Sequence, residues 1–406
     1  MAENQIPHEL LAKLAGQIIQ DPGIPVAAPT VSAWQEPAHP IATIQSDKLP
    51  QRTDFAIIGS GITGTSVAKT LLENELARDK TITMFEARSL TTGATSRNGG
   101  FLLSHAPPFF KRYAEALGID AARDIALFCD RTLESIVDMA KAENLDKASQ
   151  IRDVTTIASF EHQEGFAEVT ESIRMYEEAI PEAKGNGFTG HLLPKLRGAI
   201  FPCRLSMTTQ KPGPQWGNRP NSWLFHTKQS YDPNTTLVEQ GLYWMQQNAE
   251  TGDLFVGGDL QRLDDFLSSD DSVISADSAR NLTDLLPKRL FKEGWTNPIT
   301  NTTMTSATAL HRIWSGILSM TADQVPIVGS VPTSISGRNV EGGEWIAAGF
   351  NGYRMSQCWL CGEAIARMAL GEQKPEWLPD VYLSTERRLG DVSMGPEAAL
   401  ASFFAR

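Results

Sequence analysis

The alternation of apolar and polar positions between residues 53 and 86 predicts the best-defined unit in the chain. An apolar run from Phe55 to Ile58 meets a glycine-rich turn, Gly59 to Gly64, and helical apolar spacing follows at once. A second short strand, Thr81 to Phe85, then ends on Glu86. Strand, glycine turn, helix and strand in this order predict a βαβ unit with two parallel strands.

The glycine turn has the G-x-G-x-x-G spacing of a dinucleotide site. Gly59 allows the tight turn, Gly61 lets a pyrophosphate approach the backbone, and Gly64 lets helix and strand pack closely. The anion would then meet unpaired N–H groups at the start of the helix. Glu86 is placed to accept hydrogen bonds from the ribose hydroxyls. The alternative is a structural glycine turn with a solvated glutamate; the combined pattern favours the dinucleotide site.

The segment after Glu86 indicates which dinucleotide is bound. Its residues Thr92-Gly-Ala-Thr-Ser-Arg-Asn-Gly-Gly100 serve no purpose in nicotinamide binding. Here the chain resembles the D-amino-acid oxidase-like (DAO) superfamily of FAD-dependent oxidoreductases, which includes glycine, sarcosine and gamma-glutamylputrescine oxidases. The resemblance implies that this loop lines the flavin and that Arg97 is a cation beside it, the alternative being a surface arginine. The residues implied to bind FAD in this part are Gly59, Gly61, Ile62, Thr63, Gly64, Glu86, Ala87, Arg88, Ala94, Thr95, Ser96, Arg97, Asn98, Gly99 and Gly100.

Periodicity along the rest of the chain predicts a second, sheet-rich domain. Helical spacing runs from Phe110 to Asn144 with a break near Gly118, and a charged helix follows from Glu161 to Ile180. On that helix the glutamates, Glu164 and Glu168 among them, form a solvated face. Strands are expected at 154–160, 198–209, 222–228, 241–247, 253–257 and 309–320, the fourth and fifth as a hairpin.

The expected fold is therefore α/β: a Rossmann-like FAD-binding domain with a mixed or antiparallel sheet, α+β substrate domain. The expected ranges are 1–52 for an N-terminal extension, 53–190 and 323–385 for the FAD-binding domain, 191–322 for the substrate domain, and 386–406 for a tail. No chemistry is assigned to the extension.

The resemblance breaks between Lys184 and Asn186. The family carries a large part of the substrate domain here, and then an apolar strand that leads into a turn like Asn186-Gly187. This chain has only the polar stretch 180–185, which is unfit for a buried central strand. A long internal block is therefore expected to be missing, with Asn186 and Gly187 still at the cofactor.

A second glycine turn, Gly349-Phe-Asn-Gly352, precedes a helix from Met355 to Leu370. The resemblance implies that this turn and helix close over the flavin's pyrimidine side. The residues it places there are Gly349, Asn351, Gly352 and Tyr353. Cys358 and Cys361 on this helix have the spacing of a redox dithiol, but two small buried side chains on an apolar face explain them more simply.

A substrate site is expected on the sheet, across the flavin from the FAD-binding domain. The strand residues Arg312 and Trp314 are the candidate catalytic residues, as a carboxylate clamp and an aromatic wall, with Arg204 nearby. A solvent-facing arginine beside a core tryptophan is the alternative. His105 is left outside this set as a loop histidine. Gly316 stands where the sarcosine oxidase branch attaches its flavin through a cysteine, so the FAD is expected to be non-covalent.

Composition limits the classes of binding partner and the cellular compartment that can be expected for this protein. The net charge of −12 without a basic block argues against nucleic acid and anionic membranes. The sequence shows no signal peptide, and its 4 cysteines are too few for a disulfide framework, so a cytoplasmic protein is expected. The resemblance implies oxidation of an amine or amino acid, with oxygen as the electron acceptor. The alternatives are a dehydrogenase with another acceptor and a catalytically dead relative that acts as a binding module.

Overall fold

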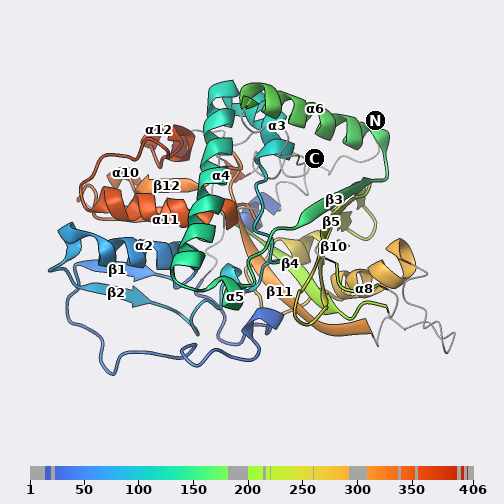
Figure 1. Cartoon of the computed structure of the whole chain (residues 1–406), viewed down its shortest axis with the longest axis horizontal. Coiled ribbons are helices and arrows are strands. Elements are labelled where there is room, and N and C mark those ends of the chain that lie inside the picture. Colours follow the sequence, from blue (N-terminus) through green and yellow to red (C-terminus); the bar gives the residue numbers. More distant parts are fainter. Residues whose placement is uncertain are drawn as a thin grey trace.

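The computed structural model describes residues 14–19, 23–181, 200–213, 216–219, 221–258, 260–291, 309–336, 340–352, 355–390, 395–396 and 400. Within these ranges the chain forms two halves that lie side by side. One holds the glycine turn and the other a large sheet, and long helices pack against both (Figure 1).

The predicted βαβ unit is present. β1 (Phe55–Ile58) pairs in parallel with β2 (Ile82–Phe85), and α2 (Ile62–Glu73) connects them. α2 also packs against α11 (Met355–Ala369), and this contact needs Gly362: an added Cβ there would lie 2.5 Å from the carbonyl oxygen of Thr63. The chain returns to this half as an antiparallel pair, β12 (Ile327–Ser330) with β13 (Trp345–Ala348).

The second half is built on a six-stranded sheet with the order β11-β4-β9-β8-β5-β3. β3 pairs in parallel with β5, and the other neighbours are antiparallel, so the predicted mixed sheet is confirmed. β3 belongs to this sheet, although it falls in the range 53–190 expected for the FAD-binding domain. The strands are β3 (Thr155–Phe160), β4 (Phe201–Gln210), β5 (Asn221–His226), β8 (Leu242–Gln247), β9 (Leu254–Gly258) and β11 (Leu310–Met320).

A layer of helices joins the two halves. α3 (Ala106–Leu117) and α4 (Ile119–Ala142) are separated at Gly118, whose φ of +91° only glycine adopts without strain. α6 (Gln163–Ala179) packs on α3, and α4 packs on α11. The largest core cluster lies between these helices, with Phe110, Ile125, Phe128, Val328, Leu360 and Tyr382 at its centre.

Smaller elements complete the fold. β6 (Ser230–Asp232), β7 (Leu237–Glu239) and β10 (Leu260–Arg262) form a small antiparallel sheet that the sequence did not indicate. The others are η1 (Ala33–Gln35), η2 (Glu75–Ala77), η3 (Ala94–Ser96), α5 (Asp146–Ser149), α7 (Leu263–Phe266), α8 (Ala276–Asp284), η5 (Leu285–Leu290), α10 (Thr333–Ser336), η6 (Asp380–Tyr382) and α12 (Glu386–Leu389).

One edge of β1 is open in the described part of the chain. β1 and β2 form a sheet of two strands, and β12 and β13 form another. Ile57 is 8% exposed, but the side chain of Ile58 is 82% exposed. Ile58 also lines the first cavity, so its side chain is exposed on the face of β1 that borders that cavity. Residues 184–186, where the break was expected, lie outside the described residues.

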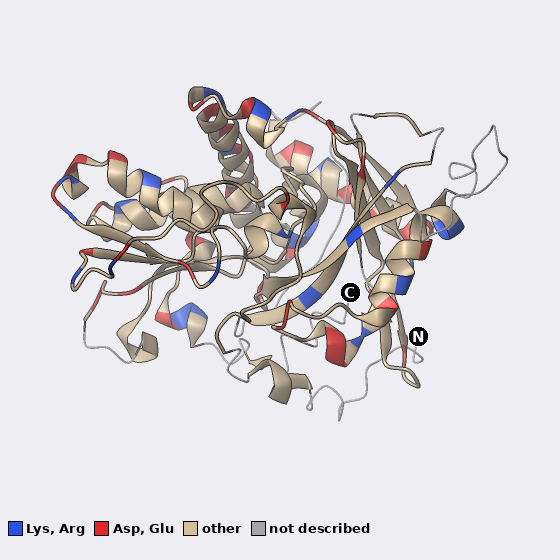
Figure 2. Ribbon diagram, turned by 90° about the horizontal axis from the view of Figure 1, so that it is seen from below, with Lys and Arg blue, Asp and Glu red and all other residues tan. Residues whose placement is uncertain are grey.

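Lys and Arg residues are interspersed with Asp and Glu residues along the ribbon of both halves (Figure 2). Among the described helices, none is both long enough and apolar enough to cross a membrane.

Candidate functional site

The glycine turn adopts the conformation that its sequence predicts. Gly59 has a φ of +100°, and Gly61 is the N-cap of α2. A Cβ on Gly64 would lie 2.1 Å from the carbonyl oxygen of Gly59, so only glycine allows the turn to pack on the helix. The first N–H groups of α2 have no acceptor within the helix, and that of Ile62 donates to Thr95 Oγ1 at 3.0 Å. These groups form a cradle for an anion.

A cavity of about 400 Å³ opens beside this cradle. It extends from the glycine turn past the loop after β2 to the sheet of the other half, where Gly316 and Leu318 of β11 line it. The predicted cofactor residues that line it are Gly59, Gly61, Ile62, Thr63, Gly64, Ala94, Thr95, Arg97, Asn98, Gly99 and Gly352.

Glu86 lies next to the glycine turn but does not line this cavity. Its Oε2 accepts hydrogen bonds from the Ser60 N–H at 3.0 Å and from Ser60 Oγ at 2.5 Å. Burial works to raise the pKa of Glu86, but these hydrogen bonds and those from neighbouring N–H groups together lower it below its usual value. Ala87 and Arg88 also lie outside the cavity lining, and Arg88 forms an ion pair with Asp271 at 3.0 Å.

Arg97 lines the first cavity, but its guanidinium is engaged by other parts of the protein. It is 3% exposed, and its guanidinium donates to Thr92, Thr30 and Ser315, with Asp271 at 3.3 Å. Burial lowers the pKa of Arg97, and the Asp271 carboxylate offsets part of that effect. The side chain therefore holds the loop from behind. Ser96 is likewise turned inward, where its Oγ donates to the Thr91 carbonyl, and Gly100 lies against Trp34 outside the cavity lining.

The second glycine turn lies where β11 ends. Gly349 and Gly352 have φ values of +74° and +73°, and a Cβ on Gly352 would lie 2.6 Å from Leu318. The Asn351 side chain is buried and accepts a hydrogen bond from the Thr321 N–H at 2.7 Å. Asn351 lines the second cavity, described next. Asn186, Gly187 and Tyr353, also expected at the cofactor, lie outside the described residues.

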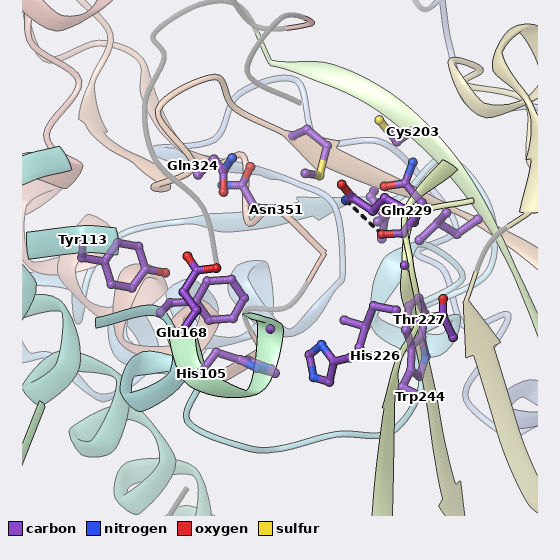
Figure 3. Close-up of a pocket in the computed structure, with 18 of the residues that line it drawn as sticks. His105, Tyr113, Glu168, Cys203, His226, Thr227, Gln229, Trp244, Gln324 and Asn351 are labelled. Atoms are coloured by element: carbon purple, nitrogen blue, oxygen red, sulfur yellow. Dashed lines mark hydrogen bonds between the residues drawn. The ribbon is translucent and has the colours of Figure 1, made fainter. Parts of the chain in front are cut away.

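A second cavity, of about 670 Å³, continues from the first. His105, Phe109, Leu205, His226, Leu242, Trp244 and Leu318 line both cavities and form the junction between them. Figure 3 shows His105, Tyr113 and Glu168 from the helical side of the second cavity, facing His226, Thr227 and Trp244 from the sheet. Asn351 and Gln324 lie toward its remaining wall.

Two titratable side chains of the second cavity have altered acidity. Burial lowers the pKa of His226 to about 4, and nearby His162 acts in the same direction. The His226 ring stacks on Phe160 with centroids 4.4 Å apart, and its Nε2 has no hydrogen-bond partner among the described residues. Burial also raises the pKa of Glu168. The cavity thus offers a neutral imidazole and a carboxyl group on opposite sides.

Arg312 and Trp314, the predicted catalytic residues, do not line either cavity of the described structure. Arg312 forms an ion pair with Glu36 of the N-terminal extension. Trp314 is fully buried beside Met207 and Phe255, and its indole N–H donates to the Arg97 carbonyl at 3.0 Å. Arg204 points to the other face of the sheet, where it pairs with Asp265 at 3.1 Å. The extension covers the end of the sheet that was expected to hold the substrate.

The cysteine pair on α11 does not have the character of an active dithiol. Cys358 and Cys361 are both buried, and no disulfide links them. Burial raises the pKa of Cys358 to about 12, so little of the reactive thiolate forms at neutral pH. Cys358 lines the first cavity, as a small apolar side chain would. The described residues contain no group of three or more His, Cys, Asp or Glu side chains suited to a metal ion.

Sequence reasoning did not select the residues at the junction of the cavities. Leu224 and His226 on β5, and Leu242 and Trp244 on β8, alternate along their strands, so each pair shares a face. The sequence shows the two-residue alternation along each strand, but it does not show the order of the strands in the sheet. Glu164 and Glu168, expected on a solvated face, both line the second cavity.

Comparison with known proteins supports the cofactor class. Residues 54–183 match the family model described as FAD dependent oxidoreductase (DAO). No curated protein sequence matches the chain.

Solved structures with a similar fold include three enzymes. They are glycine oxidase from Geobacillus kaustophilus (13% identity, 83% of this chain and 99% of that one, TM-score 0.54), L-proline dehydrogenase from P. horikoshii (13%, 83% and 98%, 0.51), and L-amino acid deaminase from Proteus vulgaris without its specific insertion (14%, 84% and 95%, 0.51).

The residues present fit FAD. The N–H groups at the start of α2 and the close approach at Gly61 suit a pyrophosphate, and the first cavity leads from them to the second glycine turn. Gly316 lies in the wall of this cavity. Residues 54–183 thus match the DAO model of FAD dependent oxidoreductases, and the fold around them is similar to that of glycine oxidase.

Proposed function

We propose that this chain oxidises a C–N bond of a small amine or amino acid to an imine, with non-covalently bound FAD as cofactor and oxygen as the electron acceptor. The observation that carries the proposal is the continuity of the two cavities. Seven residues line both, so a ligand in the second cavity would lie against the end of a dinucleotide held in the first.

FAD, when bound, accepts a hydride from the carbon next to nitrogen. The chain's own residues must therefore hold the substrate with that carbon at the junction. Trp244 and Leu242 on β8 provide one wall there and Phe109 on α3 another. These apolar side chains exclude water from the junction, and the polar residues of the second cavity are left to orient the substrate.

The substrate nitrogen must be uncharged for its carbon to give up a hydride, and His226 is proposed to hold it in that form. Because burial keeps its ring neutral at pH 7, a ring nitrogen can accept a hydrogen bond from a substrate N–H. Glu168, across the cavity, can attract an ammonium group into it. An amine enters as a cation, pairs with Glu168, gives its proton to water and then, as the neutral amine, donates a hydrogen bond to His226.

The test is to purify the protein, record its flavin spectrum and offer it a panel of amines and amino acids. Bleaching of the flavin absorbance under anaerobic conditions would identify substrates, and oxygen consumption would identify the acceptor. A yellow protein whose flavin no panel member reduces would count against the reaction, though not against the cofactor.

The similar fold of L-proline dehydrogenase favours one alternative, a dehydrogenase that passes electrons to an acceptor other than oxygen. Flavin that is reduced by substrate but reoxidised by a dye and not by oxygen would establish it. The edge of β1 that has no partner strand among the described residues favours another alternative: a relative that no longer catalyses and acts as a binding module. A colourless protein that cannot be reconstituted with FAD would establish that one.

A further inference from the structure

Residues 30–36 of the N-terminal extension, here called the strap, run along the back of the cofactor loop, residues 94–99. The front of this loop lines the first cavity through Ala94, Thr95, Arg97, Asn98 and Gly99. No strap residue lines either cavity of the described structure. The strap therefore contacts the loop through residues that do not line the cavities.

The strap and the sheet together engage three consecutive carbonyl groups of the loop. Ser32 Oγ donates to the carbonyl of Ser96, and Trp34 Nε1 donates to that of Asn98 at 2.8 Å. Between them, Trp314 of β11 donates to the carbonyl of Arg97. A backbone whose successive carbonyls are all engaged from one side has little freedom to move.

The strap is itself fixed to the sheet domain. Trp34 stacks on Phe255 of β9 with ring centroids 4.4 Å apart. The Thr30 N–H donates to the Asp271 carbonyl at 2.9 Å, and Thr30 Oγ1 accepts from the Ser315 N–H at 3.0 Å. Ser32 is fully buried. The strap is thus a bridge from the substrate sheet to the cofactor loop.

We propose that the strap presets the cofactor loop, so that FAD affinity depends on Ser32 and Trp34, two positioning residues that lie behind the binding surface. An ordered loop loses less conformational entropy when FAD binds, and the dissociation constant for FAD is lower for that reason. Linkage makes the effect reciprocal: if the strap strengthens FAD binding, FAD must stabilise the strap. The inference rests on the FAD binding assumed in the proposed function.

The first test measures hydrogen exchange in the wild-type protein with and without FAD. The amides of Thr30, Ser32 and Gln35 are hydrogen-bonded and serve as reporters. We expect FAD to slow exchange in residues 30–36 by about threefold or more, although the cofactor does not contact them. A protein that binds no FAD would overturn the proposed function and this inference together. A protein that binds FAD without protection of 30–36 would overturn this inference alone.

The second test measures the FAD dissociation constant of variants by fluorescence titration of the apoprotein. Ser32→Ala removes the donor to Ser96. Trp34→Phe keeps a ring on Phe255 but removes the donor to Asn98. Each should raise the dissociation constant about tenfold, as the loss of one well-placed hydrogen bond does.

Glu36→Gln is the matched control. It lies on the same segment, but it weakens only the exposed ion pair with Arg312 and should change the dissociation constant less than twofold. Variants that lower the melting temperature of the apoprotein but bind FAD within twofold of wild type would show a merely structural role and overturn the proposal.

Discussion

Ile57 and Ile58 are neighbours in β1, yet the first side chain is 8% exposed and the second 82%. Ile57 packs with Leu71 and Ala366 between the strand pair and the helices. Ile58 ends the strand at the glycine turn and lines the mouth of the first cavity. Successive side chains of a strand point to opposite faces, so the contrast separates the face of β1 that packs on the helices from the face that borders the cavity.

The contrast gives a direct stability test. Ile57→Ala should lower the free energy of unfolding by about 2–4 kcal/mol, because it leaves a cavity in a packed core. Ile58→Ala, its matched control, should change it by less than about 0.5 kcal/mol. Chemical denaturation of both variants measures the difference. Equal losses would mean that the Ile58 side chain is packed as tightly in solution as that of Ile57.

Restoring the family's intervening block between Lys184 and Asn186 should raise both flavin content and melting temperature. A strand supplied beside β1 would pair the N–H and C=O groups of the edge that has no partner strand among the described residues. The two chains are to be expressed side by side and compared by flavin absorbance per protein and by thermal unfolding. Equal values in both would show that the shorter chain completes the sheet in another way.

Gly61→Val should abolish flavin retention. Even a Cβ at this position would lie 3.0 Å from Thr95 Oγ1, and the two further methyl groups of valine would project into the anion cradle. Gly93→Val is the control, since an added Cβ at Gly93 meets no atom within 4 Å. The flavin absorbance of the two purified variants measures how much cofactor each retains. A Gly61→Val protein that stays yellow would contradict the assignment of the pyrophosphate site.

Acid precipitation should release all of the flavin to the supernatant, because Gly316 stands where a linking cysteine would be. Cys358 also lines the first cavity, but burial raises the pKa of its thiol to about 12. The thiol is therefore a poor nucleophile at pH 7. Flavin retained in the pellet would point to a different attachment, and mass spectrometry of the flavin peptide would locate it.

His226 should make the folded protein sensitive to mild acid. Its pKa is about 4 in the folded chain, below its usual value, so the unfolded chain binds more protons between pH 6.5 and 4. The contribution of neutral His226 to stability is therefore complete above pH 6.5 and falls as the pH falls toward 4. His226→Phe keeps a ring against Phe160 and cannot be protonated. The drop in melting temperature from pH 7.5 to 5 should be smaller in this variant, and an identical drop would rule out His226 as the cause.

The sequence alone determined the βαβ unit, the cofactor class and most elements of the sheet. The reason is that these rest on local rules: Gly59, Gly61 and Gly64 are required by backbone geometry, and apolar periods of 2 and 3.6 report strand and helix. The break between α3 and α4 at Gly118 could be predicted because it also depends on a local rule, the backbone freedom of glycine.

The placement of side chains toward the site was decided by the tertiary structure. Arg312 and Trp314 lie on a strand of the right sheet, but the N-terminal extension covers that end of it, and contacts across so long a stretch of chain leave no local signal. From the sequence, Glu168 was expected to be one of many solvated glutamates. In the structure α6 packs on α3, and Glu168 lines the same cavity as His226. Arg97 had the residue type of a cofactor ligand, but Asp271 and Thr30 hold it behind the loop. A side chain's direction depends on which distant elements pack beside it, and the periodicity of one segment does not contain that information.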